Sequence, residues 1–181
     1  MEYYKKIPLK DGRECVLRNG TPADAQAVLD NFILTHAETD FLTSCPDEIH
    51  FTVEKEEQFL KSRTESDCEI EILAEVDGRV VGTAGIDRIG GYAKVKHRAG
   101  FGISIERDAW GLGIGRALTK ACIECAEKAG YTQLELEVVA ANTRAAALYE
   151  SEGFIEFGRN PRGFCLGNSY QELVLMRRAL R

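Results

Sequence analysis

The spacing of hydrophobic and polar residues predicts strands and helices from residue 14 onward. Residues 14–18 alternate between apolar and polar side chains, as a strand with one buried face does. The segment T-P-A-D at 21–24 supplies an N-cap residue, a proline at the first helical position and an acid at the third. It predicts a helix that runs to about Thr39. The apolar side chains on one face of this helix are Ala25, Val28, Leu29, Phe32 and Ile33.

The middle of the chain has the composition of a helix followed by an antiparallel sheet. The pair Asp77-Gly78 between two runs rich in β-branched residues is a hairpin signal. The elements expected here are a loop at 41–52, a helix at 53–63 capped by Thr52, and strands at 69–76, 80–88 and 95–105.

The last third of the sequence returns to helical spacing, and glycines mark where the helices stop. Gly130 and Gly153 each follow an amphipathic run directly, as C′ glycines do. The expected elements are helices at 113–129 and 142–152, strands at 133–139, 154–159 and 170–177, and a turn-rich segment at 160–169.

The predicted order is β-α-α-β-β-β-α-β-α-β-β, which favours an α+β fold. Its sheet should be mixed and mostly antiparallel, with helices packed on it. Neither an internal repeat nor a low-complexity linker interrupts residues 1–181, so we expect a single domain.

Composition narrows the classes of protein that remain. A chain of 181 residues with 44% hydrophobic residues can bury one sizeable core. The net charge of −6 argues against a nucleic-acid binder, since such proteins neutralise phosphates. There is no apolar run long enough to cross a membrane, and the first ten residues carry charges and Pro8. We therefore expect a cytoplasmic protein without nucleic-acid or membrane partners, and a homodimer is left open.

Six cysteines and an uneven charge distribution bear on candidate sites. Cys122-x-x-Cys125 is the one close pair and lacks a second pair to complete a zinc site, so we expect reduced structural thiols and no metal. Residues 47–75 hold ten acidic and three basic side chains, whereas residues 77–116 hold seven basic and four acidic ones. Most of these charges solvate exposed faces. A sharper hypothesis places an anionic ligand near the basic stretch and a cationic one near the acidic stretch.

The segment D-A-W-G-L-G-I-G-R-A-L at 108–118 places three glycines where a helix begins. A nucleotide P-loop is excluded because Arg116-Ala117 follows the last glycine instead of Lys-Ser/Thr. A dinucleotide fingerprint has a suitably spaced acid in Glu135 or Glu137, but its third glycine would fall at residue 116, so this interpretation is disfavoured. Two interpretations remain: a cradle for a phosphate at the helix N-terminus, and tight helix–strand packing.

Two motifs in this region resemble those of a known family. The stretch W-G-L-G-I-G-R-A-L resembles the acyl-CoA-binding signature Q/R-x-x-G-x-G/A of the GNAT-superfamily N-acetyltransferases. The stretch V-A-A-N-T-R-A-A-A-L-Y-E-S-E-G-F at 139–154 is similar to that family's V-x-x-x-N-x-x-A-x-x-L-Y-x-x-x-G-F segment. Trp110 departs from the signature, because relatives carry Gln or Arg there. We expect Trp110 to pack against the sheet and the glycines to bind through their backbone alone.

The resemblance implies an acetyl-CoA-dependent N-acetyltransferase that transfers the acetyl group directly to a primary amine, without an acetyl-enzyme. The acidic 47–75 stretch, including Glu56, Glu57, Glu71 and Glu75, suggests that the acceptor is a small cationic amine or a peptide N-terminus. A non-catalytic acyl-CoA-binding or sensory module is the alternative. By the resemblance, the pantetheine arm would pair with Ile103, Ser104 and Ile105, and Asn142 would contact the cofactor arm. The pyrophosphate would be held by Gly111, Leu112, Gly113, Ile114, Gly115 and Arg116. Tyr149 would give a proton to the leaving thiolate.

The base that removes the amine proton is less clearly marked. His97 has a suitable reference pKa, and strand alternation would place it on the same face as Phe101 and Ile103. In some members of the family a base lies early on this strand. Alternatives to His97 are a histidine that is simply exposed, a chain of waters, or one of the carboxylates of Glu71, Glu75 and Glu106.

Overall fold

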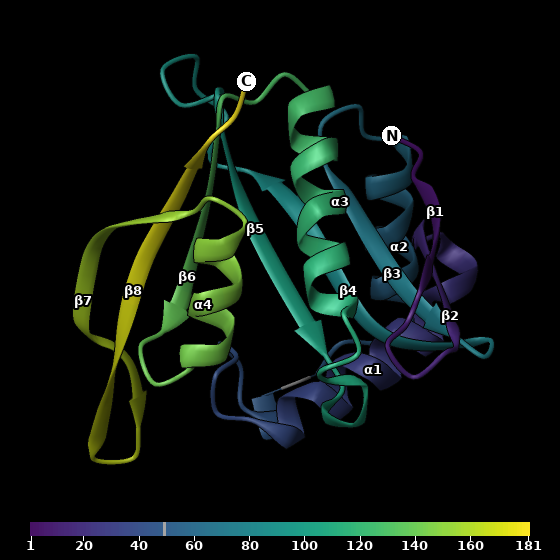
Figure 1. The fold of residues 1–181 in the computed structure, drawn as a ribbon, viewed down its shortest axis with the longest axis horizontal. Helices are drawn as coiled ribbons and strands as arrows, with labels where there is room; N and C mark the ends of the chain where they lie inside the picture. Colours follow the sequence, from purple (N-terminus) through teal and green to yellow (C-terminus); the bar gives the residue numbers. More distant parts are fainter. Residues whose placement is uncertain (49) are drawn as a thin grey trace.

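The computed structural model describes residues 1–48 and 50–181, and its elements follow the predicted order with one more strand at the front (Figure 1). The helices are α1 (Ala25–Glu38), α2 (Val53–Glu65), α3 (Ile114–Lys128) and α4 (Thr143–Ser151). The strands are β1 (Tyr4–Pro8), β2 (Glu14–Asn19), β3 (Ile70–Val76), β4 (Arg79–Arg88), β5 (Arg98–Ile105), β6 (Gln133–Val139), β7 (Ile155–Leu166) and β8 (Ser169–Ala179).

All eight strands form one sheet in the order β1-β2-β3-β4-β5-β6-β8-β7. Neighbouring strands are antiparallel except β5 and β6, which run parallel. The predicted α+β class with a mixed, mostly antiparallel sheet is confirmed.

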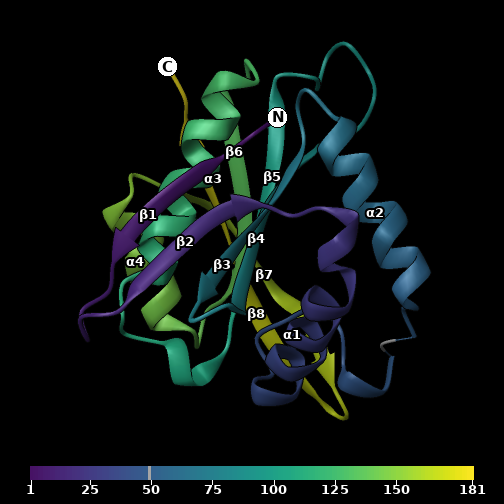
Figure 2. The same ribbon diagram turned by 90° about the vertical axis from the view of Figure 1, so that its right-hand side faces the viewer.

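The helices cover the two faces of the sheet in pairs. Figure 2 shows α1 and α2 on one side of the strands and α3 and α4 on the other. The main core lies under α3, where Leu118 and Cys122 pack against Ile72, Ile86 and other strand residues. A smaller core under α1 and α2 contains Ala25, Val28, Leu60, Leu73 and Val80.

Thr52 caps α2 as expected, whereas Thr21 caps a short 3-10 turn and α1 itself begins at Ala25 with Asp24 as its N-cap residue. Asp24 Oδ2 accepts hydrogen bonds from Thr21 N over 2.9 Å and from Thr21 Oγ1 over 2.8 Å, in the short 3-10 turn that leads into α1. Thr52 Oγ1 accepts a hydrogen bond from the Lys55 amide at the start of α2. Gly130 and Gly153, with φ of +82° and +85°, follow α3 and α4 in the left-handed conformation.

The parallel pair β5 and β6 separates soon after it forms. Cα pairing covers Arg98–Gly100 against Gln133–Glu135, after which β5 stays with β4 as far as Ile105 and β6 stays with β8 as far as Val139. The sheet therefore opens between the carboxyl ends of β5 and β6.

Three boundaries differ from the prediction. β1 was not expected, β5 begins at Arg98 rather than at residue 95, and β7 and β8 run through most of the segment expected to be a turn. β7 tolerates Pro161 because it is an edge strand whose register shifts between Asn160 and Phe164, so a missing N–H breaks no ladder.

The cysteines are reduced, and the described residues show neither a metal-binding cluster nor a membrane-spanning helix. The six cysteines are free thiols, and Cys122 and Cys125 lie on the buried face of α3, where burial raises the pKa of the Cys122 thiol well above its ordinary value. Among the described residues no cluster of His, Cys, Asp or Glu side chains is arranged to hold a metal ion. No described helix is long and apolar enough to span a membrane.

Candidate functional site

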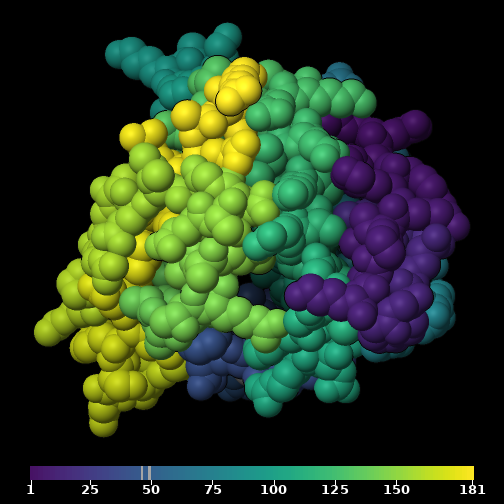
Figure 3. Space-filling view, in the orientation of Figure 1, coloured from purple at the N-terminus to yellow at the C-terminus, as the bar shows by residue number. Residues whose placement is uncertain are grey.

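A cavity of about 1090 Å³ lies where β5 and β6 separate. Figure 3 shows a hollow between the segments of α3 and α4, with the segment that follows α1 beneath it. The cavity is lined from both faces of the sheet. On the α3 and α4 face the lining includes Lys10, Gly111, Gly113, Arg116, Arg144 and Tyr149, and elsewhere it includes Thr39, Phe41, Leu42, Glu135, Glu137, Phe157 and Phe164.

Two of the three glycines before α3 are required by backbone conformation. Gly111 has φ of +83°, and Gly113, the N-cap of α3, has φ of +103°. In this region a side chain is strained, whatever space surrounds it. Because the first N–H groups of a helix have no partner within the helix, this turn presents donors and the positive end of α3 to the cavity. The arrangement suits an anion such as a phosphate.

The third glycine is explained by packing. A Cβ on Gly115 would lie 3.3 Å from Leu148 Cδ2 and 3.4 Å from Ile105 Cδ1, tighter than most such contacts. Gly115 thus lets α3 approach both α4 and the end of β5. The two interpretations left open by the sequence therefore apply to different glycines of the same loop.

Most of the predicted cofactor-binding residues converge on this cavity. Ile103, Ser104 and Ile105 line it at the end of β5, as do Gly111, Gly113, Gly115 and Arg116 in the loop and Asn142 at the start of α4. Leu112 and Ile114 do not line it, and Ile114 is fully buried. Asn142 is the N-cap of α4, and its Oδ1 accepts a hydrogen bond from the Ala145 amide over 3.2 Å.

Tyr149 projects from α4 into the same space. Its side chain is 7% exposed, and its ring packs edge-on against Phe101, with a centroid separation of 6.0 Å. Burial raises the pKa of Tyr149 to about 12. The phenol therefore keeps its proton throughout the neutral range and stands in the cavity as a hydrogen-bond donor.

Two carboxylates line the cavity from β6, and they differ in their partners. Glu135 pairs with Arg98, which lowers the pKa of that carboxyl. Glu137 has no ion pair within the described chain. Since Leu136 and Val138 belong to the core beneath α3, alternation turns Glu135 and Glu137 to the α1 and α2 face of the sheet.

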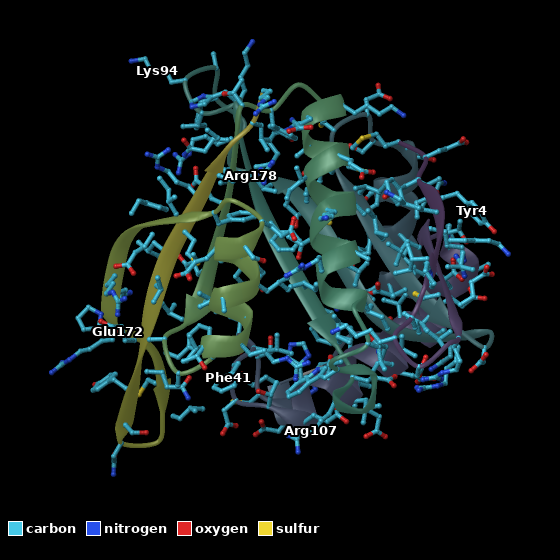
Figure 4. The ribbon with its side chains drawn as sticks, in the orientation of Figure 1. Tyr4, Phe41, Lys94, Arg107, Glu172 and Arg178 are labelled. Carbon is cyan, nitrogen blue, oxygen red and sulfur yellow. The ribbon has the colours of Figure 1, made fainter. Side chains whose placement is uncertain are left out.

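His97 does not reach the cavity. It lies in an exposed turn before β5 rather than on the strand, so the predicted alternation with Phe101 and Ile103 is wrong. Figure 4 labels Lys94 in this turn at the top of the view, whereas Phe41 and Arg107 lie near the bottom. The turn that holds His97 thus lies at the N-terminal end of β5, whereas Ile103, Ser104 and Ile105 line the cavity at its C-terminal end.

The carboxylates of the acidic stretch also lie outside the cavity lining. Glu75 pairs with Arg18, and Glu56 and Glu57 belong to α2. Glu71 lies on β3 under α2, where its carboxylate rests against Gly85. The acidic side chains that line the cavity are therefore Glu135 and Glu137, and none of the four carboxylates named from the 47–75 stretch does so.

Sequence analysis missed Arg144, the second residue of α4. Its guanidinium lies 5.3 Å from the centroid of the Trp110 ring and lines the cavity. The Trp110 indole is 37% exposed and donates a hydrogen bond from Nε1 to the Ile105 carbonyl over 2.7 Å. Trp110 thus closes the end of β5 rather than lying flat on the sheet. In the sequence, the only indication of this arrangement was that a tryptophan stands at position 110 instead of the Gln or Arg of the family signature.

Comparison with known proteins places this geometry in a family. A model of the acetyltransferase (GNAT) family matches residues 33–154, more than half of the chain. Over 56 residues the sequence is 48% identical to the [ribosomal protein bS18]-alanine N-acetyltransferase of Escherichia coli K12. That match covers 31% of this chain and 38% of the relative, so the chain is aligned to little more than a third of that protein.

Solved structures agree over nearly the whole chain. A GNAT-family acetyltransferase from Streptococcus pneumoniae superposes with a TM-score of 0.87 and 29% identity, covering 92% of this chain and 99% of that one. A ribosomal-protein-alanine N-acetyltransferase from Brucella melitensis gives 0.81 and 27%, covering 91% and 99%. An acetyltransferase from Salmonella typhimurium, solved with acetyl-CoA, gives 0.83 at 17% identity over 92% and 94%, which shows a common fold.

Proposed function

Because this chain belongs to the GNAT acetyltransferase family, we propose that it transfers an acetyl group from acetyl-CoA to the α-amino group of a peptide N-terminus. The predicted family membership is confirmed, and acetyl-CoA is the cosubstrate of this family's acetyltransferases. The acceptor is our proposal, as are the roles of individual residues.

One observation carries the proposal: a single cavity is lined from both faces of the sheet at the gap between β5 and β6. The glycine-rich turn and the N-terminus of α3 lie on one face and suit the phosphates of CoA. Glu137 and the loop after α1 lie toward the other face, which leaves that end for the acceptor. A thioester in the gap would then meet an amine from the opposite side.

Tyr149 and Glu137 divide the proton transfers between them. An amine attacks a thioester in its neutral form, so Glu137 would take the ammonium proton, directly or through water. As the C–S bond breaks, the Tyr149 hydroxyl would donate a hydrogen bond to the sulfur on which charge develops. With a pKa near 12, Tyr149 is a weaker acid than a thiol of reference pKa about 8.5, so stabilising the thiolate by hydrogen bonding is favoured over complete proton transfer.

The acceptor class is supported by the relatives and by the shape of the site. Two of them, from Escherichia coli and Brucella melitensis, are named as acetyltransferases of a ribosomal-protein alanine. The acceptor end is lined by Phe41, Phe157 and Phe164, and Phe157 is 49% exposed. An open apolar wall suits the residues that follow a peptide's first amine.

A panel of acceptors tests this proposal. The purified protein is mixed with acetyl-CoA and synthetic peptides that have free or blocked N-termini, and with small amines of one and two charges. Thiol release and mass spectrometry report transfer. We expect acetylation of free N-termini and none of blocked ones. Transfer to small amines alone would contradict the peptide acceptor, and acetyl-CoA binding without transfer to any amine would favour the non-catalytic module.

A further inference from the structure

Trp110 leaves the glycine-rich loop without the polar side chain that Gln or Arg would supply at that position. In the structure a cation reaches the loop from another element, because Arg144 Nη2 lies 3.6 Å from the point where a Cβ of Gly111 would stand. The guanidinium therefore sits against the backbone of the turn. It approaches from α4, whereas the turn precedes α3.

We propose that Arg144 binds the pyrophosphate of acetyl-CoA and that Trp110 is the residue that positions it. The inference rests on the proposed function, since it concerns the donor end of the same cavity. It adds a binding residue on α4 to a site otherwise made by the main chain of the loop.

Four basic side chains line the cavity, and within the described residues Lys10 and Arg144 have no ion pair while Arg98 and Arg116 are paired. Arg116 forms an ion pair with Glu152 and a hydrogen bond with Ser151 Oγ, and Arg98 is paired with Glu135. Arg144 has no ion pair within the described residues 1–48 and 50–181. Its guanidinium is exposed and stacks on the Trp110 ring, which leaves its five N–H donors available to phosphate oxygens.

The Trp110 ring is fixed in place and can therefore position the guanidinium that stacks on it. The hydrogen bond from Nε1 to the Ile105 carbonyl fixes the ring at the end of β5. Arg107 also lies near this ring, at 5.8 Å, but its main-chain N–H and its guanidinium both bind Glu38, and it does not line the cavity. Of the two arginines near the ring, Arg144 is therefore the one that faces the cavity.

Trp110 is the sole tryptophan of the chain, so its fluorescence reports binding next to Arg144 without any assay of activity. The wild type and Arg144→Ala are titrated with CoA, with 3′-dephospho-CoA and with pantetheine. A charge-assisted hydrogen bond contributes enough that we expect at least about a tenfold loss of affinity for the first two ligands. Affinity for pantetheine, which lacks the pyrophosphate, should not change.

Arg162→Ala is the matched control, because Arg162 also stacks on an aromatic ring, that of Tyr170, and lies outside the cavity. It removes the same charge and should leave all three affinities unchanged. Equal losses in the two variants would overturn the proposal, because the effect would then be one of net charge. A loss seen with CoA and absent with 3′-dephospho-CoA would also overturn it, by placing Arg144 at the 3′-phosphate.

The positioning role of Trp110 has its own test by calorimetry. Trp110→Leu should weaken CoA binding in the wild type and add little in Arg144→Ala, since the two residues act as a unit. Trp110→Phe retains a ring face and should lose less. In the Arg144→Ala background, Trp110→Arg should restore part of the affinity. Additive losses would overturn the positioning role, and a wild type that binds no CoA would overturn the proposed function itself.

Discussion

The carboxylate of Glu71 on β3 lies directly over Gly85 on β4, where an added Cβ would clash with Glu71 Oε2. Glycine at 85 makes room for this side chain beneath α2. Burial is the main cause that raises the pKa of Glu71 to about 7, and Asp87 on β4 and Glu56 on α2 raise it further, while Thr83 and Arg63 act in the opposite sense. The protein thus holds a carboxyl that titrates near neutral pH, outside the candidate active site.

Glu71 should make the folding stability fall as the pH rises from about 4.5 to about 7. Above its ordinary pKa of 4.5 the unfolded chain releases this proton, whereas the folded chain keeps it until about pH 7, so the folded state is favoured below this window. In Glu71→Gln this decline disappears. The difference between wild type and variant should amount to at most about 3 kcal/mol across the window, measured by urea unfolding at several pH values.

A matched variant separates this effect from others in the same pH range. Glu57→Gln removes an exposed carboxylate of α2 and should leave the pH dependence unchanged. Burial lowers the pKa of His36, which gives a slope of opposite sign, but this contribution is common to both proteins and cancels in the difference. Parallel stability curves for wild type and Glu71→Gln would contradict the raised pKa.

Gly113→Ala should reduce both stability and affinity for acetyl-CoA. With φ of +103° at the N-cap of α3 and no atom within 4 Å of the added Cβ, the cost is backbone strain of about 1–2 kcal/mol. Gly78→Ala is the control, because Gly78 has φ of +76° and equally open space in the turn between β3 and β4, which does not line the cavity. It should lose similar stability in urea unfolding and keep the affinity. Equal affinities for both variants would show that the turn does not hold the ligand.

The sequence predicted the elements that bury a regular face and missed those that do not. β1 is an edge strand in which Ile7 alone is partly buried, so the pattern of Tyr4–Pro8 shows no alternation. Residues 95–97 continue the apparent alternation of β5, yet the strand starts at Arg98, where pairing with Gln133 begins. No residue next to His97 marks where β5 begins, and His97 was therefore wrongly placed on the strand.

The sequence predicted the backbone turn of the candidate site, but it did not predict the side chains that reach the site from other elements. The turn at Gly111 and Gly113 can be recognised because glycine has a conformational reason to be there. Arg144 approaches this turn from another helix, and Glu137 faces the gap because β5 leaves β6 after three residue pairs. Both depend on how distant segments pack, which the spacing of residues along one segment does not specify.

Tyr149→Phe should lower kcat while leaving the affinity for acetyl-CoA within about twofold. Phenylalanine keeps the ring contacts with Phe101 and Phe154, so stability and the shape of the cavity are preserved. Loss of one hydrogen-bond donor to a charge that develops in the transition state typically costs about 10²–10³ in rate. Tyr131→Phe, which removes a buried hydroxyl outside the cavity, is the control and should retain kcat. A Tyr149→Phe enzyme with unchanged kcat would exclude the donor role.

Glu137→Gln should lower kcat by about 10² or more at pH 7, and the loss should shrink as the pH rises. Without a base, the reaction depends on the fraction of acceptor that is already neutral, and an α-amino group titrates near 7.7–8.0. Partial recovery of kcat/KM by pH 9 therefore indicates an N-terminal amine, whereas a lysine-like amine of pKa about 10.4 would recover little there. Glu172→Gln, an isosteric change on β8 outside the cavity, should follow the wild-type profile. If Glu137→Gln follows it as well, the base lies elsewhere.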